Sequence, residues 1–188
     1  MNDNSKKIVL DLCGGTGAWS RPYADAGYDV RLVTLPEQDV KHYRPPDNVY
    51  GILAAPPCTE FSLAKGGKPR DFRSAMRIVW ACIEIIWACR LENELTFWCL
   101  ENPRGFLRQF LGKPPLTVEY WWFGDNMQKP TDLWGYYNPP QPKYTEPPGL
   151  LQQCDKIKEI RAVQNLSRAA VRAITPPGFA AAFFKANQ

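Results

Sequence analysis

The feature that most constrains the fold is a regular alternation of short apolar runs with segments of helical pattern. The first apolar run, Lys7 to Cys13, leads directly into the turn Gly14-Gly15-Thr16-Gly17, and a helical pattern follows from Ala18 to Ala26. Further strand-like runs lie at Asp29 to Leu35, Val49 to Ala54 and Thr96 to Leu100. This alternation predicts an α/β fold with a doubly wound, mostly parallel sheet. A chain of 188 residues is long enough to form one domain spanning 1–188.

The remaining segments are expected to be more varied. The longest helical pattern, with an apolar face, runs from Asp71 to Leu91. We expect a short helix at Arg104 to Leu111, weaker strands at Val118 to Phe123 and Asp132 to Tyr136, a proline-rich extended loop at Asn138 to Gly149, and helical material from Ser167 to Ala186 interrupted at Pro176-Pro177.

Composition narrows the classes of function. The net charge of +4 permits a polyanionic partner without demanding one. The six cysteines form no CxxC pair, which argues against a zinc site and gives no disulfide framework, so no metal is expected. His42 is the single histidine, which excludes a catalytic scheme that needs several. There is no run of about 18 apolar residues and no signal peptide before the first strand, so we expect no membrane association and a cytoplasmic location.

The glycine-rich turn between the first strand and the first helix is the first candidate binding element. Glycines at this place let a ligand approach the backbone closely. The turn is neither a phosphate-binding P-loop nor a GxGxxG fingerprint, because its glycines stand at positions 14, 15 and 17 and no Gly-Lys-Ser/Thr follows. A plain tight turn between strand and helix remains the alternative. The carboxylate that often ends the second strand is absent, and Thr34 stands there instead.

The second candidate element is Cys58. The apolar run from Gly51 ends at Pro56-Pro57, which stiffen the backbone and place Cys58 at the carboxyl end of a strand, where ligands bind in open α/β sheets. Such a thiol is either a nucleophile or a buried structural cysteine. Glu101 directly ends the run TFWCL, so its side chain should lie in the same cleft as Cys58. The alternative is that Glu101 caps the start of a helix.

Three motifs together resemble one family. The stretches LDLCGGTGAW, AAPPCTEFS and ENPRGF occur in the order of the cytosine-5 DNA methyltransferases, and the resemblance covers roughly residues 7–110. The chain looks like the compact, phage-type members of that family. The resemblance implies the S-adenosylmethionine-dependent methyltransferase type of Rossmann-like sheet. It also implies methyl transfer from S-adenosyl-L-methionine to C5 of cytosine in DNA.

The resemblance also implies roles for individual residues. Cys58 would attack C6 of the ring and Glu101 would act as an acid at N3. The residues implied to contact substrate are Pro57, Ser62, Asn102 and Arg104, together with Lys65, Lys68 and Arg70 on a glycine-hinged loop suited to a phosphate backbone. Those implied to contact the cofactor are Asp11, Cys13, Gly14, Gly15, Thr16, Gly17, Ala18, Trp19, Thr34, Asp39, Val40 and Pro56. The DNA would be single-stranded, or duplex with the target cytosine flipped out.

The chain departs from the family pattern in several places. Family members usually have phenylalanine where Cys13 stands and an acid near Thr34. Their Gln-x-Arg-x-Arg motif is matched only in part by Gln128 to Asp132, which contains no arginine. Lys129 and Thr131 are the candidate substitutes for the motif's arginines. Their terminal motif is not visible, and 172–179 occupies its expected place.

We expect no full target-recognition domain, because 188 residues are too few for the separate one that family members carry. The range 113–149 is the candidate for a reduced recognition insert, and a partner protein is the other source of recognition. Two alternatives therefore stay open. One is cytosine in RNA or in a free nucleotide as substrate. The other is a degenerate methyltransferase fold that binds nucleic acid or a protein without turnover.

Overall fold

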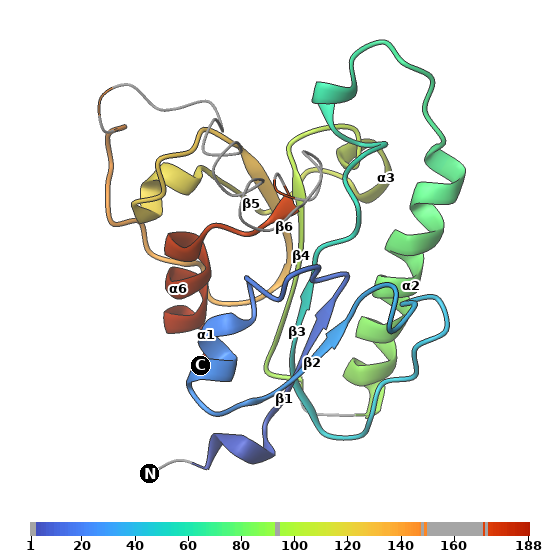
Figure 1. Cartoon of the computed structure of the whole chain (residues 1–188), viewed down its shortest axis with the longest axis vertical. Helices are drawn as coiled ribbons and strands as arrows, with labels where there is room; N and C mark the ends of the chain where they lie inside the picture. The colour runs from blue at the N-terminus through green and yellow to red at the C-terminus, as the bar shows by residue number, and fades with distance from the viewer. Residues whose placement is uncertain (1–2, 93–94, 148, 150–170, 172) are drawn as a thin grey trace.

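The centre of the protein is a six-stranded sheet with the strand order β2-β1-β3-β4-β6-β5. The computed structural model describes residues 3–92, 95–147, 149, 171 and 173–188 (Figure 1). The strands are β1 (Ile8–Leu12), β2 (Asp29–Val33), β3 (Val49–Ala54), β4 (Phe97–Pro103), β5 (Leu116–Val118) and β6 (Thr131–Tyr136). Strands β2, β1, β3 and β4 run parallel, whereas β6 is antiparallel to both β4 and β5. The prediction of an α/β fold with a mostly parallel sheet is confirmed.

The helices differ in length from the sequence-based expectation. They are α1 (Arg21–Asp25), α2 (Phe72–Glu92), α3 (Arg108–Leu111) and α6 (Pro177–Ala186), with 3-10 helices η1 (Asn4–Lys6), η2 (Leu63–Lys65) and η3 (Tyr120–Phe123). The first helix is shorter than predicted because the turn after β1 continues to Ser20, and Pro22 then stands in the first helical turn. None of the described helices is long and apolar enough to cross a membrane. The predicted helical stretch before residue 171 lies outside the described residues.

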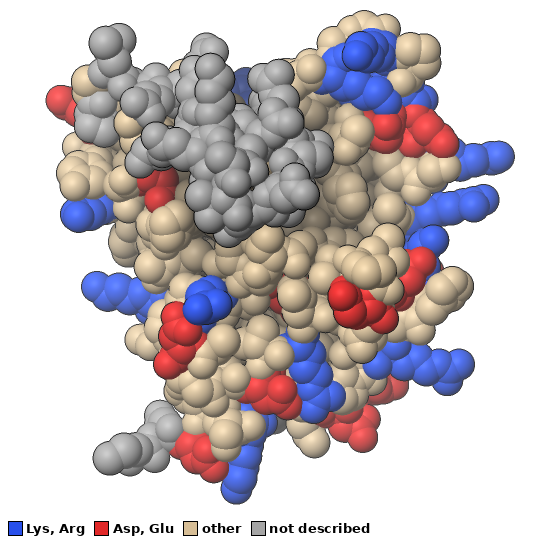
Figure 2. Space-filling model, in the orientation of Figure 1, with Lys and Arg blue, Asp and Glu red and all other residues tan. Residues whose placement is uncertain are grey.

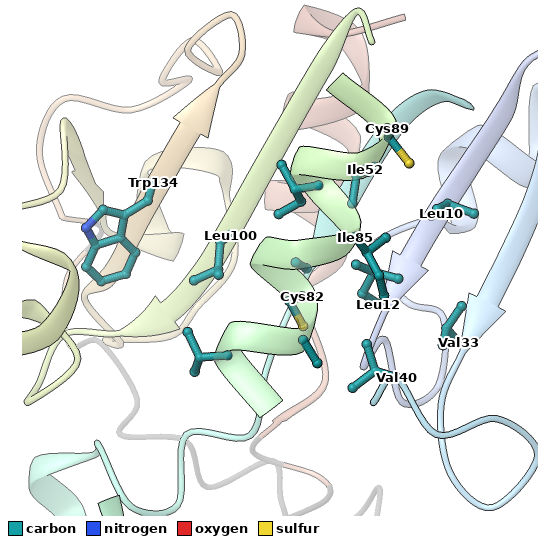
Figure 3. Close-up of a cluster of buried hydrophobic side chains, with 14 of the residues drawn as sticks. Leu10, Leu12, Val33, Val40, Ile52, Cys82, Ile85, Cys89, Leu100 and Trp134 are labelled. Carbon is teal, nitrogen blue, oxygen red and sulfur yellow. The ribbon is translucent and has the colours of Figure 1, made fainter. Parts of the chain in front are cut away.

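Helix α2 covers one face of the sheet. Its buried side chains recur at helical spacing, from Met76 through Val79 to Cys82, Ile86 and Cys89, so that one stripe faces the strands. Figure 3 shows Cys82 and Ile85 among side chains from neighbouring strands. This packing is the main reason for the helix's stability, since a fully buried aliphatic side chain contributes about 1.5–3 kcal/mol.

The opposite face of the sheet is covered by aromatic residues. Trp19 and Tyr23 lie before and within α1, and they pack against Phe179, Phe183 and Phe184 of α6. Alternate residues of β1, β3 and β4 therefore enter two separate clusters, as a sheet buried on both faces requires.

Helix α6 is fixed at its start by Asp125. The backbone N–H groups of Gly178 and Phe179 both donate to the Asp125 carboxylate at 2.8 Å. A carboxylate satisfies two otherwise unpaired donors at the positive end of the helix. The helix begins at Pro177, which has no N–H group to leave unpaired.

Most of the range 113–136 belongs to the sheet and its core. Val118, Tyr120 and Leu133 are buried, and β5 pairs with β6 over three residue pairs. The prediction of a strand over Val118 to Phe123 was wrong, because the strand ends at Val118 and a 3-10 helix follows. The three-residue spacing of Tyr120 and Phe123 buries both rings on one side of that helix, and this gain outweighs their preference for strands.

Candidate active site

The turn after β1 is held in an unusual backbone conformation. Cys13 has a φ of 58°, and Gly15 and Gly17 have φ values of 58° and 70°. A Cβ atom at Gly14 would lie 2.3 Å from the carboxyl group of Asp11, so no other residue fits there without displacing it. The turn therefore passes directly over the end of β1 and leaves its backbone open to a ligand.

Asp11 is a fully buried carboxyl group at this turn. Its Oδ2 accepts a hydrogen bond from Ser20 Oγ at 2.6 Å, whereas its buried Oδ1 has no hydrogen-bond partner. Burial raises the pKa of Asp11 from its ordinary 3.8 to about 6, and the Ser20 hydrogen bond opposes this shift. A buried carboxyl group with an unpaired oxygen is suited to a ligand that brings a positive charge or an N–H donor.

The loop after β3 places Cys58. The Cys58 carbonyl oxygen accepts hydrogen bonds from the N–H groups of Phe61 at 3.0 Å and Ser62 at 2.8 Å, which closes a tight turn. The buried Asn102 of β4 donates from Nδ2 to the Pro56 carbonyl oxygen at 2.9 Å. Asn102 therefore ties the Cys58 loop to the strand that carries Glu101.

Glu101 lies within β4, not at its end. Strand β4 continues to Pro103 because its last residues pair with β6, where Glu101 stands opposite Leu133. Glu101 is 7% exposed, and its Oε2 is buried without a hydrogen-bond partner. Burial raises the pKa of Glu101, while Lys129 and a hydrogen bond with Tyr120 oppose the rise. A buried acid of this kind keeps its proton more readily than an exposed glutamate.

The glycine turn, Cys58 and Glu101 line a single cavity of about 300 Å³. A cavity of this size matches the lower end of the range for small-molecule sites. The other residues that line it are Leu35, Ala55, Pro56, Pro57, Lys129, Ala173, Ile174 and Thr175, and the turn contributes Asp11, Cys13, Gly14, Gly15, Thr16 and Trp19. Residues from the C-terminal halves of β1 and β4 and from the loop after β3 therefore meet at one site, near the edge where open parallel sheets favour ligands.

A second cavity, of about 510 Å³, adjoins the first and is also lined by Cys58. Both cavities are lined by Cys58, Cys13 and Lys129, and the second also includes Ser62 and Lys65. Cys58 thus lines two adjoining spaces, of which the first also includes Asp11 and Glu101. This arrangement allows two ligands to meet beside one thiol.

Several residues predicted to contact the cofactor lie away from the first cavity. Gly17 and Ala18 line a neighbouring hollow on the α1 side of the turn. Thr34, Asp39 and Val40 do not line the cavity. The Asp39 carboxylate accepts from the Lys41 N–H group at 3.0 Å, and Val40 belongs to the core cluster under α2.

The loop after Cys58 is held by its own side chains. Lys65 forms an ion pair with Glu60, and the Arg70 guanidinium donates to the carbonyl oxygens of Glu60 and Gly66. The Arg70 guanidinium also lies 4.6 Å from the ring centre of Phe106. Two of the three loop cations predicted to contact phosphate therefore bind the protein itself, and Lys68 is the exposed one.

Two other predicted substrate residues have local structural roles. The Ser62 side chain caps η2 by accepting from the Ala64 N–H group at 3.2 Å, while Ser62 also lines the second cavity. Arg104 is exposed, and its backbone N–H group donates to the Pro130 carbonyl oxygen at 2.9 Å.

Sequence reasoning missed Leu35, Tyr120 and Thr175. Leu35 is 70% exposed yet lines the first cavity, and its position just after β2 could have marked it. Tyr120 is buried, its side chain forms a hydrogen bond with Glu101, and burial raises its pKa well above the usual value. Thr175 enters from the segment before α6, within the range 172–179 that stands in the expected place of the family's terminal motif, although sequence reasoning assigned Thr175 itself no role.

Comparison with known proteins adds no family assignment. No protein-family model matches the chain, and no curated protein matches it. Among the described residues, no group of three or more histidine, cysteine, aspartate or glutamate side chains could hold a metal ion. On the face in Figure 2, lysine and arginine side chains are interspersed with aspartate and glutamate. The geometry of the site is therefore the basis on which a function can be inferred.

Proposed function

We propose that the protein transfers a methyl group from S-adenosyl-L-methionine to C5 of cytosine in DNA, as a phage-type member of the cytosine-5 methyltransferase family. The observation that carries this proposal is the meeting of Cys58, Glu101 and the glycine turn around one cavity. A thiol, a buried acid and a ligand-binding turn are the three parts that this chemistry needs. Their positions in the chain match the three motifs that suggested the family.

The residues of the turn fit the implied cofactor. The unpaired oxygen of Asp11 suits an ammonium or sulfonium group, and the absence of a side chain at Gly14 leaves room for that carboxyl group at the wall of the cavity. Leu35 and Trp19 offer apolar surface in the same cavity for an aromatic ring. When bound, S-adenosyl-L-methionine supplies an electrophilic methyl group.

Cys58 supplies the nucleophile. Cytosine C5 is a poor nucleophile, so the Cys58 thiolate first adds to C6, and the new carbon–sulfur bond pushes electrons toward N3. Burial raises the pKa of Glu101 and so favours its protonated form, which donates a hydrogen bond or its proton at N3 and stabilises the charge that develops there. C5 is then enamine-like and accepts the methyl group. Loss of the C5 proton and of the Cys58 sulfur restores the ring.

Lys129 is placed to stabilise the same negative charge that develops on the cytosine ring. It lines both cavities, and its ammonium group favours the ionised form of Glu101 and opposes the effect of burial. A cation beside the base also stabilises electrons that move toward N3 and the neighbouring carbonyl oxygen. We therefore assign Lys129 to the substrate site, where the family motif would place an arginine.

The test is incorporation of a labelled methyl group. The full chain is incubated with labelled S-adenosyl-L-methionine and, separately, with duplex DNA, single-stranded DNA, RNA and dCMP. We expect label in DNA at C5 of cytosine, and none with Cys58→Ser. Cys89→Ser, a buried cysteine on α2 away from the cavity, is the matched control and should retain activity if it folds.

The alternative functions give different results in the same assay. Label in RNA or dCMP but not in DNA would show that the substrate is not DNA, while the proposed methyl transfer to cytosine would stand. No label in any substrate, with nucleic acid still bound, would favour a methyltransferase-like fold that binds without turnover.

A further inference from the structure

A pair of thiols, of which one lines the cavity and the other is buried beneath it, lies outside the proposed chemistry. The sulfur atoms of Cys13 and Cys82 are 4.0 Å apart, although the residues are 69 positions apart in the chain. Cys13 belongs to the turn after β1, and Cys82 lies in the buried face of α2. Both are free thiols.

The two cysteines differ in their access to small molecules. Cys13 is partly exposed and lines both cavities, so a small oxidant can reach its sulfur atom. Cys82 is completely buried, and its hydrogen bond with Cys13 together with burial raises its pKa well above the usual value. An oxidant that enters the cavity therefore meets Cys13 first, and Cys82 lies where a resolving thiol is needed.

We propose that Cys13 and Cys82 form a peroxide-sensitive pair whose disulfide ties the glycine turn to α2. Cys13 sulfur attacks one oxygen of hydrogen peroxide, the O–O bond breaks, and one water leaves as Cys13 becomes a sulfenic acid. Cys82 sulfur then displaces the hydroxyl group, and the S–O bond breaks as the S–S bond forms. The displaced hydroxyl takes the Cys82 proton and leaves as a second water. Two thiols are oxidised by two electrons, and one peroxide is reduced to two waters.

The geometry indicates which side moves. A disulfide needs its sulfur atoms about 2.05 Å apart, so the pair must approach by about 2 Å. Cys82 is in the middle of a 21-residue helix that is packed on the sheet, whereas Cys13 is followed by a glycine-rich turn. We expect Cys13 to move toward α2, which alters the cavity wall beside Cys58.

Peptide mapping of the whole protein tests this inference. The wild-type chain is treated with hydrogen peroxide, its remaining thiols are alkylated, and a non-reducing digest is analysed by mass spectrometry. We expect a peptide joining Cys13 to Cys82 that has lost the mass of two hydrogen atoms and separates on treatment with a reductant. The oxidised protein should also unfold at a higher temperature, because the crosslink closes a long loop.

Cysteine variants test whether the disulfide joins Cys13 to Cys82 and not to another cysteine. Cys58→Ser and Cys89→Ser should both still form the Cys13–Cys82 peptide. Cys82→Ser should form none, and its Cys13 should react with a sulfenic acid probe. The inference is wrong if Cys13 pairs with another cysteine, or if Cys13 and Cys82 remain thiols at a peroxide concentration that oxidises Cys58. This test does not depend on methyl transfer.

Discussion

Ionisation of the buried Asp11 should lower the free energy of unfolding as the pH rises, and Asp11→Asn should remove this loss. Asp11 is fully buried, and burial raises its pKa from 3.8 to about 6. Below pH 3.8 the carboxyl group is protonated in both the folded and unfolded chain and contributes no difference. Between 3.8 and about 6 the unfolded chain loses this proton first, so the folded state becomes less stable by about 1.4 kcal/mol per pH unit. Above pH 6 the cost levels off at about 3 kcal/mol.

Asparagine has nearly the same shape and can still accept the hydrogen bond from Ser20, but it does not titrate. The free energy of unfolding is measured by urea titration of wild type and Asp11→Asn from pH 4.5 to 7.5. The stability of the variant relative to wild type should increase by about 2 kcal/mol over this window, because part of the total has already been lost at pH 4.5.

Asp25→Asn is the matched control for this experiment. Asp25 is an exposed aspartate in a surface ion pair with Arg21, and such pairs contribute little. Its stability relative to wild type should hardly change with pH. A flat or falling difference for Asp11→Asn would refute the assignment of Asp11 as a buried carboxyl group that is costly to ionise.

The same residue predicts how a cationic ligand binds. A positively charged ligand group beside Asp11 needs the ionised carboxylate, so affinity for S-adenosyl-L-methionine should rise with pH up to about 6 and then level off. Calorimetry of the Asp11→Asn variant should show weaker binding without this rise.

Further variants probe the rest of the site. Gly14→Ala places a Cβ atom 2.3 Å from the Asp11 carboxyl group and should abolish cofactor binding in calorimetry. The new methyl group of Gly15→Ala meets nothing within 4 Å, so this variant should retain measurable binding, at a cost of about 1–2 kcal/mol in backbone strain. Burial raises the pKa of Glu101 and Lys129 opposes it, so Lys129→Met should shift the alkaline limb of the pH–rate profile to higher pH, and Lys129→Arg should not. Lys68→Ala should weaken binding to all DNA sequences about equally and reduce the salt slope by about one; an unchanged slope would place phosphate contacts elsewhere.

Much of the fold could be predicted from the sequence because its strands are short, apolar and regularly spaced. The bounds predicted for β3 are those observed, and α2 is displaced by one residue. The extension of β4 to Pro103 could not be predicted, since it depends on pairing with β6, which is distant in the chain. Local preference also gave the wrong structure for Tyr120, because burial of its ring decided the conformation.

For the site, the sequence predicted the positions of residues that follow apolar runs better than those of residues that approach from elsewhere. Cys58 and Glu101 follow apolar runs, so their convergence follows from a parallel sheet. The sequence indicated Lys129 only as a candidate substitute for a motif arginine, and its position in the lining of both cavities depends on the fold. The engagement of Arg70 with backbone carbonyl groups could not be inferred from a loop that is rich in basic residues and glycine.

The most direct test of covalent catalysis is trapping with cytosine that carries fluorine at C5. The fluorine cannot leave as a proton does, so after methyl transfer the bond between Cys58 and C6 persists. Wild-type protein with S-adenosyl-L-methionine and the fluorinated DNA should give a covalent complex whose digest carries the modified base on Cys58. Cys58→Ser should give none, while retaining cofactor binding. An adduct that forms equally in Cys58→Ser, or no adduct with DNA that the protein demonstrably methylates, would contradict the account.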